Sequence, residues 1–358
     1  MVKLGFFDAA SPGGTHLRRM KFTMSRLTLA KPLRILLLLL TAVALYGDSA
    51  QAQFTLTSLV TTTKDPNLKN AWGITYLPGG AFWISDEFTG LSTVYDANGT
   101  IVPLVVTVPT GSTGKGSPTG IAANTTSGFV VTQNGVSGAA SFIFATLDGT
   151  ISGWNSTVNA TAAVIAVNNH ATANYTGLAI GTSGTQTFLF AANQATNKIE
   201  VYNNKFKLVK TFTDTKLTGL KVYGVAVLNK QVYVTFSGAT TGAVDVFTTS
   251  GTFVKTLIPA TSTLKGPWGL AIAPTNFHTF SGSLLVGDVN DGRINGFNLT
   301  TGKLIGPLKD KTGKVISVSG LWGLIFGGGT STNGNKNQLF FAAGTGGYAT
   351  GEFGVINP

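Results

Sequence analysis

The sequence predicts an all-β protein: a six-bladed β-propeller with four antiparallel strands per blade, whose last blade is closed by the N-terminal strand 54–62. A glycine-centred motif recurs six times between residues 73 and 323, at spacings of 45 to 57 residues. Short apolar strands follow every copy, and no stretch has the capped periodicity of a helix. Propellers are rings of about 4–8 four-stranded blades. Residues 53–358 provide about 51 residues for each of six blades.

The innermost strand of each blade starts at the glycine motif, which reads "AWGIT" in the first copy and "PWGLA" in the fifth. The motif glycines are Gly73, Gly120, Gly177, Gly224, Gly269 and Gly323. Inner strands converge on the axis of a propeller, where glycine lets two backbones approach closely. The residues before the glycines then form a ring of their own: Trp72, Thr119, Thr176, Tyr223, Trp268 and Trp322. Large aromatics dominate core burial, so these side chains are predicted either to wedge between blades or to line a site.

Three further strands are predicted in each repeat. The second is β-branched and aromatic, as in a strand buried on both faces. Its copies are 81–86, 128–133, 187–193, 231–237, 283–288 and 338–344. The third strand alternates apolar and polar residues, at 90–96, 149–155, 197–203, 242–248, 292–298 and 351–357. Fourth strands are predicted at 101–108, 162–168, 208–213, 253–258 and 303–308.

The sixth repeat has no fourth strand of its own before Pro358. The unassigned strand "FTLTSLVTT" at 54–62 is predicted to supply it. Pairing the first strand of the chain with the last closes the ring, and it hides sheet edges that would otherwise favour aggregation.

The first 52 residues have the pattern of a signal peptide. A basic region contains Arg26, Lys31 and Arg34, the apolar run 35–46 follows, and "AQA" at 50–52 has the small-x-small pattern of a cleavage site. The apolar run is shorter than the roughly 20 residues of a transmembrane helix. An uncleaved N-terminal anchor is the alternative.

Residues before Met24 do not resemble a signal peptide, so the N-terminus is predicted to be over-extended, with Met20 or Met24 as the initiator. The mature chain, 53–358, is predicted to be a single propeller domain without a transmembrane segment. We expect it to be secreted, extracellular or periplasmic. The chain has no cysteine, so packing and hydrogen bonds must hold the fold without disulfides.

The distribution of charge argues against nucleic-acid binding. Residues 53–358 hold 18 Lys and Arg against 12 Asp and Glu, a net charge of +6, and Arg293 is the one arginine among them. The lysines are scattered, and no set of arginines is present to read base edges. We expect a monomer whose partner is a small molecule, a glycan or a protein at the propeller face.

Polar residues at the ends of the second strands form the best candidate site. They are Asp86, Gln133, Asn193, Ser237, Asp288 and Gly344. In a propeller these ends lie on one face around the channel mouth, where oxygen ligands from Asp86, Asn193 and Asp288 would suit Ca²⁺ or sugar hydroxyls. The alternative is that each Asp or Asn hydrogen-bonds its own turn.

Trp72, Trp268 and Trp322 are the predicted aromatic part of this ligand-binding mouth, because aromatic rings cover the apolar faces of a ligand that polar groups orient. No catalytic residue is assigned. The histidines of the mature chain, His170 and His278, have no partner at metal-ligand spacing, and no G-x-S-x-G motif is present.

The strings "NAWGI", "FWISDEFTGLSTVYDANG", "FIFATLDGTISGWN", "GPWGLAIAP" and "GLWGLIFGGG" together resemble an uncharacterised family of exported bacterial β-propeller proteins, many with a PEP-CTERM sorting tail. The resemblance covers about 70–358. It implies the propeller fold and export, and it brings no established activity. The chain ends in "FGVINP" without such a tail, so sorting by that route is not implied. "LLVGDVNDGRINGFN" is more distantly similar to the NHL repeat.

Two function classes follow. The first is a secreted binding or scaffold protein of unknown ligand that uses the channel-mouth face. The second is a metal-dependent, lactonase-like hydrolase of the gluconolactonase type, which also has six blades. That resemblance requires an asparagine before the inner-strand glycine, where this chain has Trp, Thr or Tyr. The departure favours binding over catalysis, since a fold alone does not decide activity.

Overall fold

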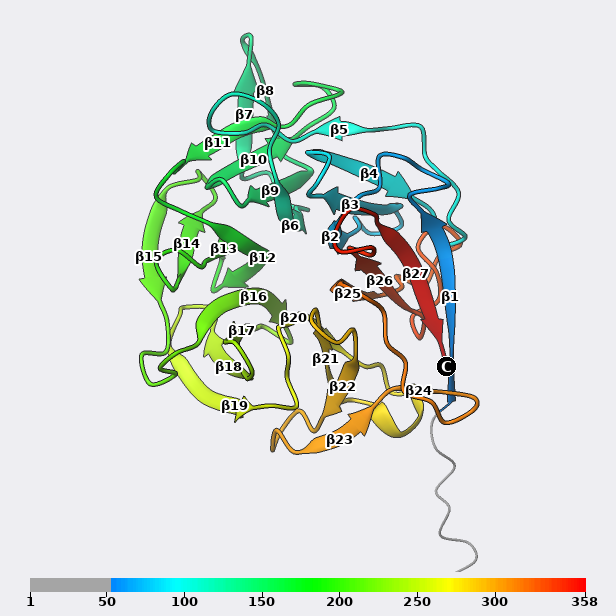
Figure 1. The fold of residues 1–358 in the computed structure, drawn as a ribbon. Helices are drawn as coiled ribbons and strands as arrows, with labels where there is room; N and C mark the ends of the chain where they lie inside the picture. The colour runs from blue at the N-terminus through cyan, green and yellow to red at the C-terminus, as the bar shows by residue number, and fades with distance from the viewer. Residues whose placement is uncertain (1–52) are drawn as a thin grey trace, which may run out of the picture. The chain divides into compact units, whose positions relative to one another are not determined.

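Six mainly antiparallel sheets follow one another around a ring in the computed structural model, which describes residues 53–358 (Figure 1). This arrangement confirms the predicted six-bladed β-propeller. Five of these sheets have four strands, and the sixth has five because a short strand joins its outer edge. In the first five blades along the chain the first strand is innermost and the last lies at the rim, whereas in the sixth the N-terminal strand lies toward the rim.

The strands of each blade are as follows. Blade one contains β2 (Ala71–Thr75), β3 (Phe82–Asp86), β4 (Leu91–Tyr95) and β5 (Val106–Thr107). Blade two contains β6 (Pro118–Ala123), β9 (Phe142–Thr146), β10 (Thr150–Trp154) and β11 (Val164–Asn168). Blade three contains β12 (Tyr175–Ser183), β13 (Gln186–Asn193), β14 (Lys198–Asn203) and β15 (Leu208–Phe212). Blade four contains β16 (Lys221–Leu228), β17 (Gln231–Ser237), β18 (Gly242–Thr248) and β19 (Phe253–Thr261). Blade five contains β20 (Pro267–Ile272), β21 (Leu284–Asp288), β22 (Ile294–Phe297) and β23 (Leu304–Pro307). Blade six contains β25 (Leu321–Phe326), β26 (Leu339–Ala343), β27 (Glu352–Asn357), β1 (Gln53–Thr61) and β24 (Lys309–Asp310).

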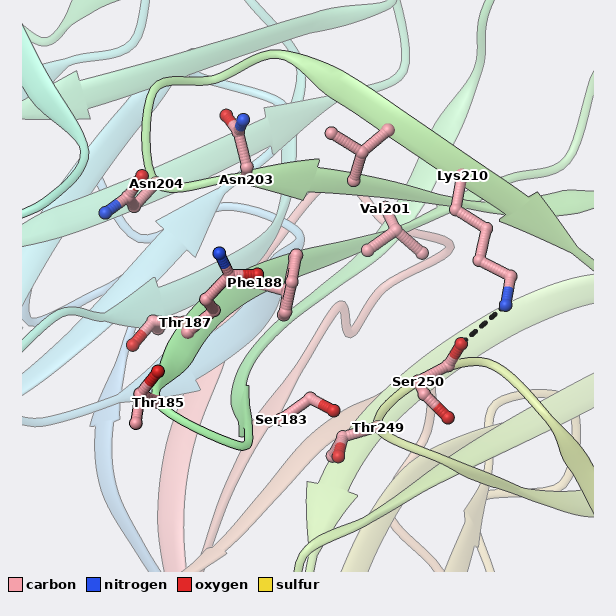
Figure 2. Close-up of a pocket in the computed structure, with 12 residues that line it drawn as sticks. Ser183, Thr185, Thr187, Phe188, Val201, Asn203, Asn204, Lys210, Thr249 and Ser250 are labelled. Atoms are coloured by element: carbon pink, nitrogen blue, oxygen red, sulfur yellow. Dashed lines mark hydrogen bonds between the residues drawn. The ribbon is translucent and has the colours of Figure 1, made fainter.

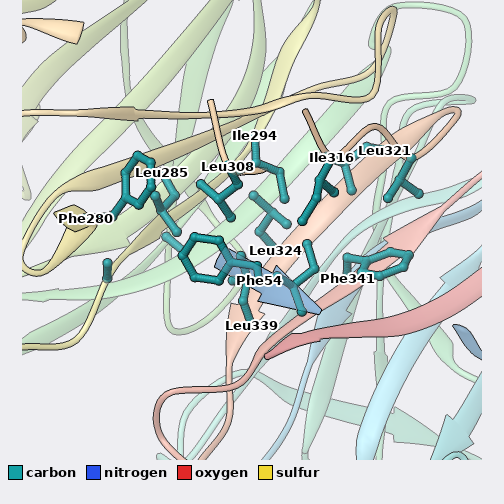
Figure 3. Packing of buried hydrophobic residues seen from close by; sticks show 14 of the residues in the cluster. Phe54, Phe280, Leu285, Ile294, Leu308, Ile316, Leu321, Leu324, Leu339 and Phe341 are labelled. Atoms are coloured by element: carbon teal, nitrogen blue, oxygen red, sulfur yellow. The ribbon is translucent and has the colours of Figure 1, made fainter. Parts of the chain in front are cut away.

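The N-terminal strand closes the ring, as predicted. β1 pairs antiparallel with β27 over six residue pairs, and its first two residues pair parallel with β24. Phe54 is buried at the start of β1, with its ring centroid 4.8 Å from that of Phe277 and 5.9 Å from that of Phe280. Figure 3 shows Phe54 inside the core between blades five and six. The first described strand therefore contributes both backbone pairing and packing to the last blade.

Blade two differs from the prediction. Its second strand is β9, and the segment 128–133 instead contributes β7 (Val130–Gln133), which forms a separate hairpin with β8 (Val136–Ala139). Asn134 and Gly135 connect the two arms with φ values of 51° and 82°, as a two-residue type I′ turn requires. Gln133 therefore does not end a blade strand, and Thr146 occupies the place predicted for it.

Each pair of neighbouring blades encloses one apolar core, and a further cluster lies among the inner strands. Second strands contribute to two cores at once. Leu285 of β21 packs toward blade six, whereas its neighbours Leu284 and Val286 pack toward blade four. Burial on both faces explains why these strands read as continuous apolar runs rather than as alternating patterns.

The repeated glycines lie where neighbouring inner strands touch, as predicted. A Cβ atom on Gly224 would come within 2.5 Å of the carbonyl oxygen of Trp268, and one on Gly323 within 2.8 Å of the carbonyl oxygen of Trp72. All six motif glycines meet the backbone of the next inner strand in this way. The inner strands thus pack directly against one another, with no space for a side chain at that level.

Helical structure within residues 53–358 is confined to η1 (His278–Phe280), a single 3₁₀ turn between β20 and β21. No helix in that range has the length and apolar character needed to cross a membrane. The predicted signal peptide, 1–52, lies outside the described residues.

Candidate functional site

The two ends of the ring carry different residues, because all six inner strands run in the same direction. Residues before the motif glycines gather at one end, which we call the tryptophan end, and residues after them gather at the other, which we call the funnel end. Second strands finish at the tryptophan end, since Asp86 pairs with Ala71 and Asp288 pairs with Pro267. This is the mouth at which the sequence predicts a ligand site.

The three predicted tryptophans meet at this end. The rings of Trp72 and Trp322 are stacked, with centroids 3.6 Å apart and an interplanar angle of 15°. Trp268 approaches them edge-on, at 6.3 Å from Trp72 and 6.1 Å from Trp322. Trp72 and Trp322 are buried, and Val289 packs with them in one cluster. The tryptophans therefore pack against one another as a core, which is one of the two interpretations that the sequence leaves open.

Hydrogen bonds orient two of these indoles. Trp268 donates from Nε1 to the carbonyl oxygen of Thr176, two blades away, at 2.7 Å. Trp322 donates from Nε1 to Oδ1 of Asn70 at 2.9 Å, and Asn70 in turn donates from Nδ2 to Glu87 at 2.8 Å. These bonds link blades one, three, five and six across the axis, so they add rigidity to the tryptophan end.

The predicted polar ligands are buried in three different blades. Asp288 accepts the backbone N–H of Lys265 at Oδ1 and the Nδ2 group of Asn295 at Oδ2, both at 2.9 Å. Asn193 donates from Nδ2 to Glu200 at 2.7 Å. Their polar atoms are thus occupied by their own blades, in the manner of Asx residues that satisfy local turns and strands. The role of the predicted residues in binding Ca²⁺ or another ligand stays a prediction.

Asp86, the third of them, is in a different situation. Its side chain is fully buried, and neither carboxylate oxygen has a hydrogen-bond partner within residues 53–358. Burial raises the pKa of Asp86 well above its ordinary value. The negative charge of the nearby Asp65 adds to the rise, whereas the polar groups of Thr93 favour the charged form and lower the pKa. Asp65 itself accepts the hydroxyl of Tyr95 at 2.8 Å. Burial therefore favours the neutral, protonated form of Asp86.

The hydrogen bonds of Asn193 and Asp288 join residues seven positions apart, a spacing that was not used in predicting the site. Asn193 bonds to Glu200 and Asp288 bonds to Asn295, each from the end of a second strand to the middle of the third. Polar residues at this spacing on both sides of a turn are visible in the sequence. They indicate side-chain pairs between neighbouring strands of one blade, rather than ligands that converge from several blades.

Blade four buries a carboxylate on its third strand without such a pair. Neither oxygen of Asp245 has a hydrogen-bond partner within the described residues. Burial raises the pKa of Asp245 to about 7, against the lowering effect of the Thr256 hydroxyl and with a contribution from the nearby Asp214. Burial likewise raises the pKa of Asp288 to about 7, although the backbone N–H of Lys265 stabilises its charged form. Burial thus brings the pKa of both carboxyl groups close to neutral pH.

The funnel end contains a cavity of about 370 Å³ lined mainly by residues with apolar side chains, and an adjoining cavity of about 260 Å³ shares five of its lining residues. The first ring of side chains after the glycines consists of Ile74, Ile121, Leu178, Val225, Leu270 and Leu324. The next ring consists of Tyr76, Ala123, Ile180, Val227, Ile272 and Phe326. Trp268, which packs against Trp72 and Trp322, also lines the larger cavity.

Polar side chains are few in this funnel, although main-chain groups of the inner strands also line it. The Tyr76 hydroxyl donates to the carbonyl oxygen of Phe326 at 2.7 Å, and burial raises the pKa of Tyr76. None of the residues that line the two cavities is Asp, Glu, His, Lys or Arg. A lining of this kind suits an uncharged apolar ligand, since a charged one would lose its hydration without gaining a partner. The repeat that predicted the inner strands already contained these positions, because each lies in the apolar run after a motif glycine, but that run was taken to predict only a strand.

The histidines lie in different parts of the ring. His170 Nδ1 is 3.3 Å from the carbonyl oxygen of Asp148, whereas His278 packs against Phe54 at a ring distance of 5.4 Å. Among residues 53–358, no group of three or more His, Cys, Asp or Glu side chains is placed to hold a metal ion. The lactonase-like alternative stays a prediction.

Comparison with known proteins finds sequence relatives without an assigned activity. No family model matches the chain. Uncharacterized protein R648 of Acanthamoeba polyphaga mimivirus is 28% identical over 301 residues, which cover 78% of this chain and 72% of R648. Uncharacterized protein R640 of the same virus is 31% identical over 228 residues, which cover 58% of this chain but 42% of R640. The relatives reported are viral, so membership of an exported bacterial family stays a prediction.

Solved structures that resemble the chain are β-propellers. Virginiamycin B lyase from Staphylococcus aureus has a TM-score of 0.53 at 14% identity, with 86% of this chain and 100% of that chain covered. The PQQ-bound aldose sugar dehydrogenase from Streptomyces coelicolor has a TM-score of 0.54 at 15% identity, with 86% and 99% covered. A gluconolactonase-type protein has a TM-score of 0.54 at 12% identity, with 86% and 92% covered. At these identities the likeness shows the fold alone.

Proposed function

We propose that this protein is a secreted, non-catalytic binding protein that takes a compact, uncharged apolar molecule into the funnel end of the propeller axis. The observation that carries the proposal is the pair of apolar rings around the cavity of about 370 Å³. Small-molecule sites typically occupy about 300–1,000 Å³ and are mostly apolar, with a few polar groups that fix orientation. The Tyr76 hydroxyl, which donates to the carbonyl oxygen of Phe326, is such a polar group.

The packed tryptophan end supports a pocket rather than a channel that runs through the ring. Trp72 and Trp322 are in stacking contact at 3.6 Å, and Trp268 lines the cavity from below. A ligand in the funnel would exchange water for the apolar rings and for the face or edge of an indole. The free-energy gain would be about 25 cal/mol for each Å² of apolar surface removed from water.

Binding of N-phenyl-1-naphthylamine, an uncharged apolar dye, tests the proposal. We expect its fluorescence to rise on addition of the protein. The substitution Ala123→Trp introduces a bulky ring at a residue that lines the cavity, and should abolish the rise. Val254→Trp is the matched control, because Val254 is 43% exposed on the rim strand of blade four.

Both variants should melt close to the wild-type temperature, so that loss of dye binding reports on the funnel rather than on folding. The proposal fails if the wild-type protein does not bind the dye. It also fails if Val254→Trp lowers dye binding as much as Ala123→Trp does.

Secretion is supported by the order of charged, apolar and small residues in 24–52. N-terminal sequencing of protein recovered outside the expressing cells should begin near Gln53. Recovery of a membrane-bound chain that retains 35–46 would instead support the uncleaved anchor.

A further inference from the structure

A groove of about 540 Å³ lies between the rims of blades three and four (Figure 2). One wall is the turn at 183–187 between β12 and β13, and a second is the end of β14 with Asn203 and Asn204. The opposite wall belongs to blade four, at Thr249 and Ser250. Figure 2 shows Lys210 reaching from blade three to Ser250, where its Nζ donates to the carbonyl oxygen at 2.6 Å.

Many polar side chains in this groove are free to bind a ligand. Within residues 53–358, no side-chain hydrogen bond is made by Ser183, Thr185, Gln186, Thr187, Asn204 and Thr249. Hydroxyls both donate and accept hydrogen bonds, and amides provide both a donor and an acceptor, so such a wall complements a molecule rich in hydroxyl groups. Phe188 and Val209 add apolar surface, which suits the C–H face of a sugar ring.

The aromatic ring is particular to this pair of blades. Phe188 lies opposite Asn203 in the ladder of blade three, and the corresponding residue of blade four is Gln231, which lies opposite Thr248. Lys255 repeats the lysine contact one blade further on, where its Nζ donates to the carbonyl oxygen of Thr300 at 2.6 Å. The interface between blades four and five therefore has a lysine that corresponds to Lys210 but a glutamine, Gln231, in place of Phe188.

The charge around the groove is positive. Residues 175–308, which form blades three to five, contain eleven Lys and Arg but five Asp and Glu. Four of the five acids are buried: Glu200, Asp214, Asp245 and Asp288. Lys210 is the one charged residue in the lining, so an anionic group on the ligand would meet a cation and no nearby exposed acid.

We propose that this groove binds an acidic saccharide, with a sugar ring against Phe188, sugar hydroxyls on the free amides and hydroxyls, and a carboxylate at Lys210. This site is separate from the funnel, whose lining contains no charged side chain. The Lys210 ammonium keeps its contact with Ser250 and has two further N–H donors for the carboxylate.

Calorimetric titration with trigalacturonate and with neutral galactotriose tests the proposal. We expect trigalacturonate to bind the wild-type protein and galactotriose to bind at least about fivefold more weakly, since charge-assisted hydrogen bonds are roughly twice as strong as neutral ones. Lys210→Gln should weaken trigalacturonate binding about tenfold and leave galactotriose binding unchanged. Phe188→Leu should weaken both ligands.

Lys255→Gln is the matched control, because it removes an equivalent lysine from an interface that lacks the aromatic. It should leave both affinities unchanged. Equal losses in Lys210→Gln and Lys255→Gln would mean general attraction to a basic surface and would overturn the proposal. Absence of trigalacturonate binding to the wild-type protein, or equal binding of the neutral sugar, would overturn it as well. Melting temperatures of all three variants identify any loss that comes from unfolding.

Discussion

Phe54 connects the first strand to the core of the last blade interface, so Phe54→Ala tests how the ring is closed. The side chain is 1% exposed, and its ring packs 4.8 Å from Phe277 and 5.9 Å from Phe280. Truncating a buried phenylalanine removes apolar burial and leaves a cavity, at a cost of about 3–5 kcal/mol in the free energy of unfolding.

This cost corresponds to a measurable shift in melting temperature. Unfolding entropy is about 2.1 cal/mol/K per residue, which gives about 640 cal/mol/K for residues 53–358. A loss of about 4 kcal/mol then lowers the melting temperature by about 6 °C. Differential scanning calorimetry or circular dichroism measures a shift of this size.

Leu56→Ala is the matched control on the same strand, because Leu56 is 40% exposed. Substitutions at such positions usually change stability by about 0.5 kcal/mol or less, which is about 1 °C here. Deleting 53–62 should lower the melting temperature further than Phe54→Ala, since it also leaves the outer edge of β27 unpaired. A melting temperature of Phe54→Ala within about 1 °C of wild type, or an equal drop in Leu56→Ala, would refute closure through this core.

Two other predictions concern buried carboxylates and the axis. Asp288 has a folded pKa of about 7 against an ordinary value of 3.8, so the folded state holds an extra proton between these values. Its contribution to stability is therefore complete below about pH 4 and is lost as pH rises through 7, by up to about 4 kcal/mol. Burial of Asp245 affects stability in the same direction. Denaturant unfolding at pH 5 and pH 8 measures the loss of stability, and Asp288→Asn should make the difference between the two free energies of unfolding smaller. Gly224→Ala puts a Cβ 2.5 Å from the carbonyl oxygen of Trp268. The free energy of unfolding should therefore fall by about 1–3 kcal/mol or more, and the melting temperature should fall with it. An unchanged melting temperature would mean that the inner strands can separate to make room for the methyl group.

The repeat made most of the fold predictable. A glycine before each apolar run marks the level at which neighbouring inner strands touch, and Gly224 against Trp268 shows that contact. Closure followed from counting strands, because the last repeat lacked one and 54–62 was left over. The predicted second strand of blade two, 128–133, was wrong for a local reason. Asn134-Gly135 is a strong hairpin signal, and reading it would have separated the inserted hairpin from the blade strand β9.

The candidate site was harder to predict, because a repeat tells which end of a strand a residue occupies but not what covers it. Asp288 does lie at the predicted end of its strand, but its Oδ2 already accepts a hydrogen bond from Asn295 on the neighbouring strand of the same blade. The tryptophans converge as the repeat requires, and they pack against one another, with Trp72 stacked on Trp322 and Trp268 edge-on to both. The apolar funnel follows from the same convergence on the far side of the glycines. Any residue type placed twice per blade after the glycine forms two complete rings, so the chemistry of the axis at that end is set by those twelve positions. Their apolar character points to the ligand class more directly than the polar strand ends do, since it leaves the cavity without a charged side chain, whereas Asn193 and Asp288 are hydrogen-bonded within their own blades.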